Sequence, residues 1–222
     1  MLITFIFILP LILLMFIIEK RIREESGRVK TRAEMLGDIG ESRVSNFLKI
    51  HYNKGFLINN VLLKNDKYTS QIDHVFITFN RDIYIIETKN RSGLIKGKLN
   101  EKNWVSFVGK KKYLLYNPIK QNEKHLRVID KLLKSNNIEN YNLKNIVVFT
   151  KDNSKIVINE ENDIVYNLKD FENLIEKIYI KGGKDNIDDI IHVIQSNNLS
   201  DNREVLEKHI NMVEEIALKN KK

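Results

Sequence analysis

The chain has 222 residues, enough for one compact domain with an anchor or a tail. It is 42% hydrophobic and 30% charged, which excludes disorder along its whole length. It has no cysteine, which excludes disulfides and thiolate metal sites. The formal net charge of +8 favours a polyanionic partner, either a phosphodiester backbone or an anionic membrane leaflet.

Residues 2–18 form an almost continuous apolar segment that only Thr4 and Pro10 interrupt. As a helix this segment would measure about 25 Å, near the lower limit for crossing a bilayer. No basic residue precedes it, and Lys20 and Arg21 follow it, so the pattern differs from that of a cleaved signal peptide. We therefore predict a retained transmembrane anchor over residues 1–19.

Residues 20–32 form a basic linker with six cations and two anions. The positive-inside rule then predicts a single-pass protein of the cell membrane, with its N-terminus outside and its domain in the cytoplasm. Contact with lipid headgroups is the favoured interpretation of this linker, and direct nucleic-acid binding is the alternative.

Hydrophobic periodicity predicts an amphipathic helix over residues 33–50. Alternating or β-branched segments then predict strands over residues 56–63, 70–79 and 83–89, and shorter strands over 93–99, 104–108 and 113–116. The continuous apolar stretch within residues 83–89 indicates a strand buried on both faces. Together these segments predict a mainly antiparallel sheet.

A helix is expected to begin at Asn117-Pro118, because proline is favoured in the first helical turn. A buried strand follows over residues 145–150, a short edge strand over 156–158 and a helix over 171–180. Apolar helical faces within residues 187–194 and 205–216 are predicted to pack, and a partner-binding helix is the alternative for the second. We expect a main domain over residues 33–150 and a mostly helical extension over 151–222.

The predicted hairpin formed by residues 70–79 and 83–89 carries three charged side chains on one face. Because side chains alternate along a strand, a three-residue loop over residues 80–82 would pair Phe79 with Ile83. Asp73 would then lie opposite Lys89, one step from Glu87. A two-residue loop would instead place Asp73 on the other face.

Two carboxylates and an ammonium at the end of apolar strands are costly unless they are paired, hydrated or bound to a cation. Carboxylate oxygens favour Mg²⁺ or Mn²⁺, and the five scattered histidines indicate no zinc cluster. A nearby lysine could orient water and stabilise charge that develops on a phosphate. An ordinary charged surface strand explains the same short spacing equally well.

The order of several motifs extends this pattern. A helix carries Gly40-Glu41, two strands carry residues 71–74 and 86–90, Trp104 follows, and residues 117–122 (Asn-Pro-Ile-Lys-Gln-Asn) open a helix. From about residue 33 to residue 134, this arrangement resembles the nuclease-related domain family, NERD, a branch of the restriction-endonuclease-like PD-(D/E)xK superfamily. The resemblance implies an α+β fold in which helices flank a mixed sheet, here preceded by the transmembrane helix.

The resemblance also implies roles for five residues. Asp73 and Glu87 would bind the metal ion, assisted by Glu41, and Lys89 would be the catalytic lysine. Gln121 would reach the substrate or the lysine from the following helix. The superfamily's proline before the aspartate is absent, since Ile72 stands there.

Each supporting residue also has a structural interpretation. Glu41 could be a solvated acid near a helix start, and Gln121 and His125 could pair on an exposed helix face. His74 faces away from Asp73 in the predicted strand and is interpreted as structural. Trp104 is interpreted as a core residue rather than a base-stacking platform. The lysines at 110–112 are interpreted as a solvated hairpin tip rather than a phosphate contact.

These observations predict a membrane-anchored, Mg²⁺- or Mn²⁺-dependent nuclease that hydrolyses phosphodiesters, with DNA favoured over RNA as the polymer. The alternative is a non-catalytic, membrane-tethered module that binds nucleic acid or a protein and keeps the nuclease fold. A third hypothesis is a structural membrane protein in which the charges form a salt-bridge cluster.

Overall fold

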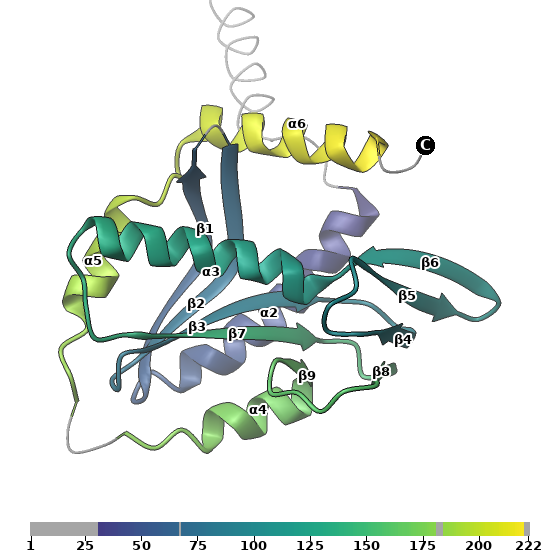
Figure 1. Ribbon diagram of the computed structural model, residues 1–222, viewed down its shortest axis with the longest axis horizontal. Coiled ribbons are helices and arrows are strands. Elements are labelled where there is room, and N and C mark those ends of the chain that lie inside the picture. The colour runs from purple at the N-terminus through teal and green to yellow at the C-terminus, as the bar shows by residue number, and fades with distance from the viewer. Residues whose placement is uncertain (1–30, 67, 181–183, 220–222) are drawn as a thin grey trace, which may run out of the picture. The chain divides into compact units, whose positions relative to one another are not determined.

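The computed structural model describes residues 31–66, 68–180 and 184–219 (Figure 1). Contacts divide the chain into residues 1–36 and residues 37–222, and both sheets belong to the second unit. The predicted anchor, and the basic linker as far as residue 30, lie outside the described residues. Among the residues that are described, no helix combines the length and the apolar character needed to cross a bilayer.

The elements follow the predicted order closely. They are α2 (Arg32–Ile50), β1 (Gly55–Asn65), β2 (Tyr68–Thr78), β3 (Asp82–Lys89), β4 (Gly93–Gly97), β5 (Asn103–Val108), β6 (Lys111–Tyr116), α3 (Pro118–Ser135), β7 (Asn142–Phe149), β8 (Ser154–Ile158), β9 (Val165–Asn167), α4 (Leu168–Glu176), α5 (Asp188–Ser196) and α6 (Arg203–Lys219). Only the three-residue strand β9 has no counterpart in the sequence-based prediction.

The strands form two mixed sheets rather than one mainly antiparallel sheet. The larger sheet has the order β1-β2-β3-β7-β9, and the smaller has the order β6-β5-β4-β8. Neighbouring hairpins pair antiparallel as predicted, but β7 pairs parallel with both β3 and β9, and β8 pairs parallel with β4. The antiparallel pairing predicted among the first six strands is therefore confirmed, but the prediction that they form one sheet is wrong, because β3 and β4 belong to different sheets and pair parallel with β7 and β8.

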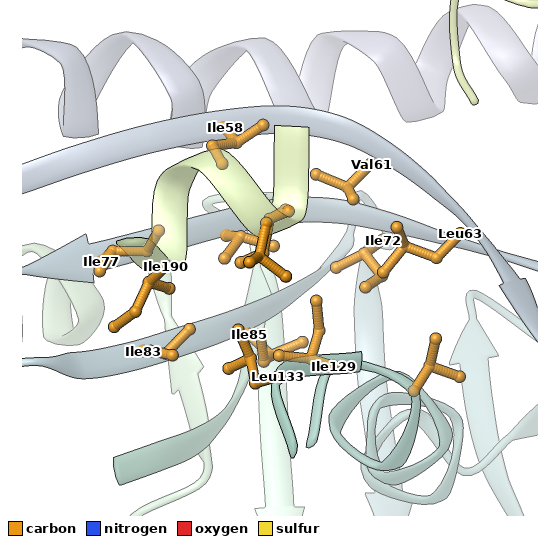
Figure 2. Close-up of a cluster of buried hydrophobic side chains, with 14 of the residues drawn as sticks. Ile58, Val61, Leu63, Ile72, Ile77, Ile83, Ile85, Ile129, Leu133 and Ile190 are labelled. Atoms are coloured by element: carbon orange, nitrogen blue, oxygen red, sulfur yellow. The ribbon is translucent and has the colours of Figure 1, made fainter. Parts of the chain in front are cut away.

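Helices cover both faces of the larger sheet. One apolar cluster joins its strands to α3 and α5, and includes Ile83 and Ile85 (Figure 2). A second cluster, with Tyr84 and Ile86, joins the other face to α2 and α4. Strand β3 is therefore buried on both faces, as its continuous apolar run indicates.

A third cluster connects the smaller sheet to the end of the larger one. Trp104 is fully buried there, lies stacked on Phe149 with ring centroids 6.4 Å apart, and donates from Nε1 to the Lys98 carbonyl. A Cβ at Gly97 would lie 2.2 Å from the Trp104 ring, so only glycine fits beside the indole. The interpretation of Trp104 as a core residue is confirmed.

The two C-terminal helices differ in burial. Ile190 and Ile194 of α5 are fully buried, which confirms the predicted packing surface. On α6, His209 is buried and its Nδ1 lies 2.7 Å from the Thr69 hydroxyl, whereas Val213 and Ile216 are about half exposed. The prediction that the apolar face of α6 packs is wrong for these two residues, because that part of the helix extends past the contact at His209.

The β2–β3 turn differs from the predicted one. Ile77, rather than Phe79, pairs with Ile83. The loop therefore comprises residues 79–81, with Arg81 in the left-handed region at φ 61° and the Thr78 hydroxyl bonded to the backbone of Asp82. Because the register differs by two residues, the predicted faces are preserved.

Candidate functional site

Asp73 lies where β2 and β3 separate. The regular ladder between these strands ends at the pair His74 and Ile86, and one further step would place Asp73 opposite Glu87 rather than Lys89. Beyond that pair, Asp73 Oδ2 accepts a hydrogen bond from the Thr88 backbone amide at 2.7 Å. The carboxylate thus takes the place of a backbone acceptor, which fixes it against β3.

Glu87 and Lys89 lie two residues apart on β3 and face α3. Lys89 Nζ donates to Glu87 Oε1, forming an ion pair in which Glu87 is only 3% exposed. Gln121 of α3 joins both: its Nε2 donates to Glu87 Oε1 at 2.8 Å, and its Oε1 accepts from Lys89 Nζ at 3.2 Å. The three side chains therefore form a closed ring of contacts between a strand and a helix.

His125 lies on the other side of Glu87, one helical turn after Gln121. Its Nε2 is 3.3 Å from Glu87 Oε2, but the two atoms do not meet hydrogen-bond geometry, and each is buried without another protein partner. Its Nδ1 lies 2.7 Å from the Ser70 hydroxyl of β2. Gln121, which is partly buried, and His125, which is buried, thus share the face of α3 directed at Glu87, so the alternative of an exposed pair on α3 is wrong.

Two asparagines fix α3 in the orientation that this contact requires. Asn117 caps the helix by accepting from the Ile119 amide at 2.9 Å, and its Nδ2 donates to the Leu99 and Glu101 carbonyls at 2.8 and 2.7 Å. Asn122 Nδ2 donates to the Ile85 carbonyl at 2.7 Å, and so attaches the helix to β3. Asn117 and Asn122 of the 117–122 motif are therefore structural.

Gly40 allows α2 to approach the ends of β3 and β7. A Cβ at this position would lie 2.7 Å from Asn90 Cβ and 2.8 Å from the Thr150 hydroxyl. Arg43 then holds the helix in place by donating to the Thr150 carbonyl and pairing with Asp152 at 2.8 Å. This close approach brings the half-buried Glu41 near enough to act on the charge of Asp73.

The electrostatics distinguish the two carboxylates on the strands. Burial, together with the negative charges of Glu87 and Glu41, holds the pKa of Asp73 well above its ordinary value. Burial also acts to raise the pKa of Glu87, but Lys89 and His125 outweigh it and the pKa of Glu87 is lowered. Burial acts to lower the pKa of Lys89, and the charges of Glu87 and Asp73 reverse this and raise it. The positive charge of Lys89 therefore offsets the negative charge of Glu87 more completely than it offsets that of Asp73.

His74 lies on the opposite face of β2, as predicted. Its Nδ1 is 2.7 Å from Asn59 Oδ1, and burial lowers its pKa to about 4. A neutral imidazole with its Nδ1 occupied in this way packs as a core side chain. His74 is therefore not brought to the cluster that surrounds Glu87.

The carboxylates are chemically suited to a hard divalent cation. Glu87 Oε2 is buried without a protein hydrogen bond, and Asp73 bears an excess of nearby negative charge that a cation would offset. Within the described residues, no group of three or more His, Cys, Asp or Glu side chains is arranged as a metal site. Among the described residues, the carboxylates that a cation could contact here are those of Asp73 and Glu87, with Glu41 near Asp73.

The structure brings together the sequence-predicted residues Asp73, Glu87, Lys89 and Gln121, with Glu41 beside them. Sequence reasoning did not assign His125 to this site. The signal for it was the four-residue spacing from Gln121, which places both side chains on one helical face.

A mixed sheet flanked by helices, with a carboxylate pair and a lysine where two strands separate, defines the general restriction-endonuclease-like kind of fold. The family model for the nuclease-related domain, NERD, matches residues 36–150, just over half of the chain. The chain belongs to this family.

An uncharacterized protein of Bacillus anthracis is 32% identical to the chain over 99 residues. The match covers 44% of this chain and 46% of that protein, so the chain spans about half the length of this curated relative. No solved structure is significantly similar to the chain.

Proposed function

We propose that the chain is a divalent-metal-dependent nuclease that hydrolyses phosphodiester bonds, with DNA favoured over RNA. The observation that carries this proposal is the ring of Glu87, Lys89 and Gln121 beside Asp73, in a chain of the nuclease-related domain family. The basic composition of the chain is consistent with a polyanionic substrate.

Asp73 and Glu87, with Glu41, would hold Mg²⁺ or Mn²⁺, which supplies charge neutralisation at the phosphate and activation of water. Lys89, kept protonated by its two carboxylate neighbours, would stabilise the negative charge that develops on the phosphate. Gln121 would hold the Lys89 ammonium at a fixed position. The buried contact with His125 would keep Glu87 from rotating.

We test this proposal with the full chain in an uncharged detergent. Wild type, Asp73→Ala and Lys89→Ala are incubated with labelled DNA and RNA and with Mg²⁺, Mn²⁺ or EDTA. Cleavage should require the metal and should fall by roughly a thousandfold or more in both variants, while Lys110→Ala at the exposed hairpin tip should cleave like wild type. Equal behaviour of wild type and both site variants on every substrate would refute catalysis.

A second candidate is a nuclease-fold module that binds nucleic acid or a protein without cleavage. It is favoured by one observation, the pairing of Glu87 Oε1 with both Lys89 and Gln121, which satisfies that oxygen without a substrate or an ion. Calorimetric binding of Mg²⁺ or Mn²⁺ that Glu87→Ala abolishes, with no turnover of any substrate, would support this candidate over the enzyme.

We further propose that residues 2–18 anchor the chain in the cell membrane as a single span, with the N-terminus outside and the domain in the cytoplasm. The apolar run and the basic linker after it support this topology. Protease added to the outside of intact cells should leave the domain uncut, and protease added after lysis should cut it. Recovery of the full chain in the soluble fraction would contradict the anchor.

A further inference from the structure

A concave surface lies beside the β1–β2 turn and the outer side of α3. This α3 basic pocket has a volume of about 470 Å³. Its lining residues are Lys64, Asn65, Asp66, Lys124, Arg127, Val128, Lys131, Leu132 and Ser135. Four of them are cations and one is a carboxylate, so the pocket carries a net positive charge.

Three cations of the pocket belong to a longer stripe on α3. Lys120, Lys124, Arg127, Lys131 and Lys134 follow one another at alternating spacings of four and three residues, which places them on one face of α3. Like charges at these spacings repel each other and do not stabilise a helix. Of the five, Lys134 pairs with Asp130 on the same helix at 2.7 Å, and the stability of α3 does not explain the other four.

A comparison with α6 shows what an ordinary solvated face looks like. On α6, Arg203 pairs with Glu207 at 3.1 Å and Lys208 with Glu204 at 2.6 Å. In the pocket Asp66 pairs with Lys131 at 2.8 Å, and no ion pair among the described residues involves Lys64, Lys124 or Arg127. Lys124 instead lies 4.9 Å from the centre of the Tyr116 ring. Among the described residues, three positive charges thus line the pocket without a carboxylate partner.

The pocket is linked to the candidate active site through adjacent residues. Lys124 directly precedes His125, which contacts Glu87. Lys64 pairs across the β1–β2 ladder with Thr69, and the next residue, Ser70, lies 2.7 Å from the same His125. The pocket therefore lies on the outer side of the same helix and hairpin that carry residues of the site.

We propose that the α3 basic pocket binds phosphate groups of the nucleic-acid backbone outside the candidate active site, on the outer side of α3. This inference rests on the proposed function and adds the surface that holds the polymer. A strand of linked phosphates can enter a concave surface, whereas a flat bilayer would reach only its rim, so the geometry favours nucleic acid over anionic lipid.

The test measures binding rather than cleavage, with the full chain in nanodiscs of uncharged lipid and with EDTA present. Fluorescence anisotropy of labelled DNA is recorded at several salt concentrations for wild type, for Lys64→Glu with Arg127→Glu, and for the control Lys110→Glu with Lys112→Glu. The control changes the net charge equally, and its two lysines are exposed at the hairpin tip.

The pocket variant should bind DNA roughly tenfold more weakly, and its slope of log affinity against log salt should be shallower by about two. The control should stay within about twofold of wild type. Equal weakening of both variants would overturn the proposal, because only net charge would matter, and so would wild-type affinity in the pocket variant.

A lipid ligand is distinguished by flotation of the same nanodiscs with phosphatidylserine vesicles. If the pocket variant lost flotation but kept its DNA affinity, the pocket would bind lipid and the proposal would be wrong. A wild-type chain that binds DNA through the pocket but never cleaves would refute the nuclease alone. Cleavage by a chain whose pocket variant binds normally would refute the pocket alone.

Discussion

The two halves of β3 face the same helix with opposite chemistry. In the first half Ile83 and Ile85 pack into the apolar cluster beneath α3 and α5. In the second half Glu87 and Lys89 face α3 with charges. Burying an isoleucine stabilises a fold by about 1.5–3 kcal/mol, whereas a buried ion pair at best offsets its own desolvation. The difference indicates that the first half holds α3 in place and the second half uses the fixed helix.

The largest expected effect comes from weakening the apolar half. Ile85→Ala should lower the free energy of unfolding by about 3 kcal/mol, because it leaves a cavity beneath α3. Urea denaturation measures this loss. Val108→Ala, at an exposed position, should change stability by less than about 0.5 kcal/mol. A loss below about 1 kcal/mol for Ile85→Ala would mean that this half of the strand does not secure the helix.

A smaller effect is expected where α2 meets the charged half. Gly40→Ala should cost about 2 kcal/mol and reduce cleavage, because the new methyl group would push Glu41 and its helix away from Asn90 and Thr150. Thermal unfolding and the cleavage rate measure the two effects.

Gly37→Ala is the matched control on the same helix, since its Cβ would meet no atom closer than 4.0 Å. It should stabilise the protein by up to about 1 kcal/mol through helix propensity, with unchanged cleavage. The comparison would fail if both alanines had the same effect.

Removing a charge from the site should stabilise the metal-free protein. The raised pKa of Asp73 means that its contribution to stability is complete below the unfolded-state value and is lost as pH rises through the folded-state value. Asp73→Asn keeps an acceptor for the Thr88 amide and should therefore gain on the order of 1 kcal/mol near pH 8 in EDTA.

Glu87 should respond in the opposite sense. Its lowered pKa gives stability that is present above the unfolded-state value and is lost as pH falls through the folded-state value.

The Asp73 prediction is measured by urea titrations of wild type and Asp73→Asn between pH 4 and 8. The two free energies of unfolding should diverge as pH rises, and Mg²⁺ should remove the advantage of the variant. A constant difference at every pH would contradict the charge clustering at Asp73.

The smallest expected effect concerns the support behind Glu87. Ser70→Ala removes the partner of His125 Nδ1 and should cost about 1 kcal/mol, with a modest fall in cleavage. Ser70→Thr keeps the hydroxyl and should retain more of both properties. Chemical denaturation together with cleavage rates tests this pair, and a cleavage rate unaffected by Ser70→Ala would show that His125 holds Glu87 without help.

Local patterns predicted the elements well, and long-range pairing less well. The strand alternation that set Asp73 and Glu87 on one face follows from backbone geometry alone and survived a two-residue error in the register. In the structure the Thr78 hydroxyl bonds to the backbone of Asp82, which closes the loop over residues 79–81. The expected loop length of three residues did not reveal this contact. The parallel pairing of β3 with β7 joins strands separated by residues 90–141, so it depends on long-range contacts that local patterns do not show.

The same dependence on long-range packing explains why the sequence did not assign His125 to the site. Its distance from Gln121 along α3 could be read from the sequence, but which side of the helix meets β3 depends on Asn122 and on the apolar residues beneath it. A polar pair at that spacing is also typical of an exposed face. The sequence could therefore predict the part of the site on one hairpin, and only the packed helix reveals the rest.

The amide of Asn122 has a mechanical consequence. Besides the Ile85 carbonyl, its Nδ2 contacts the Ile146 carbonyl at 3.1 Å and so joins two neighbouring parallel strands. A slide or a rotation of α3 by one residue would break both contacts. The inner side chains of the helix and the cations on its outer side must therefore move as one body, so any polymer that contacts both sides has to do the bending itself.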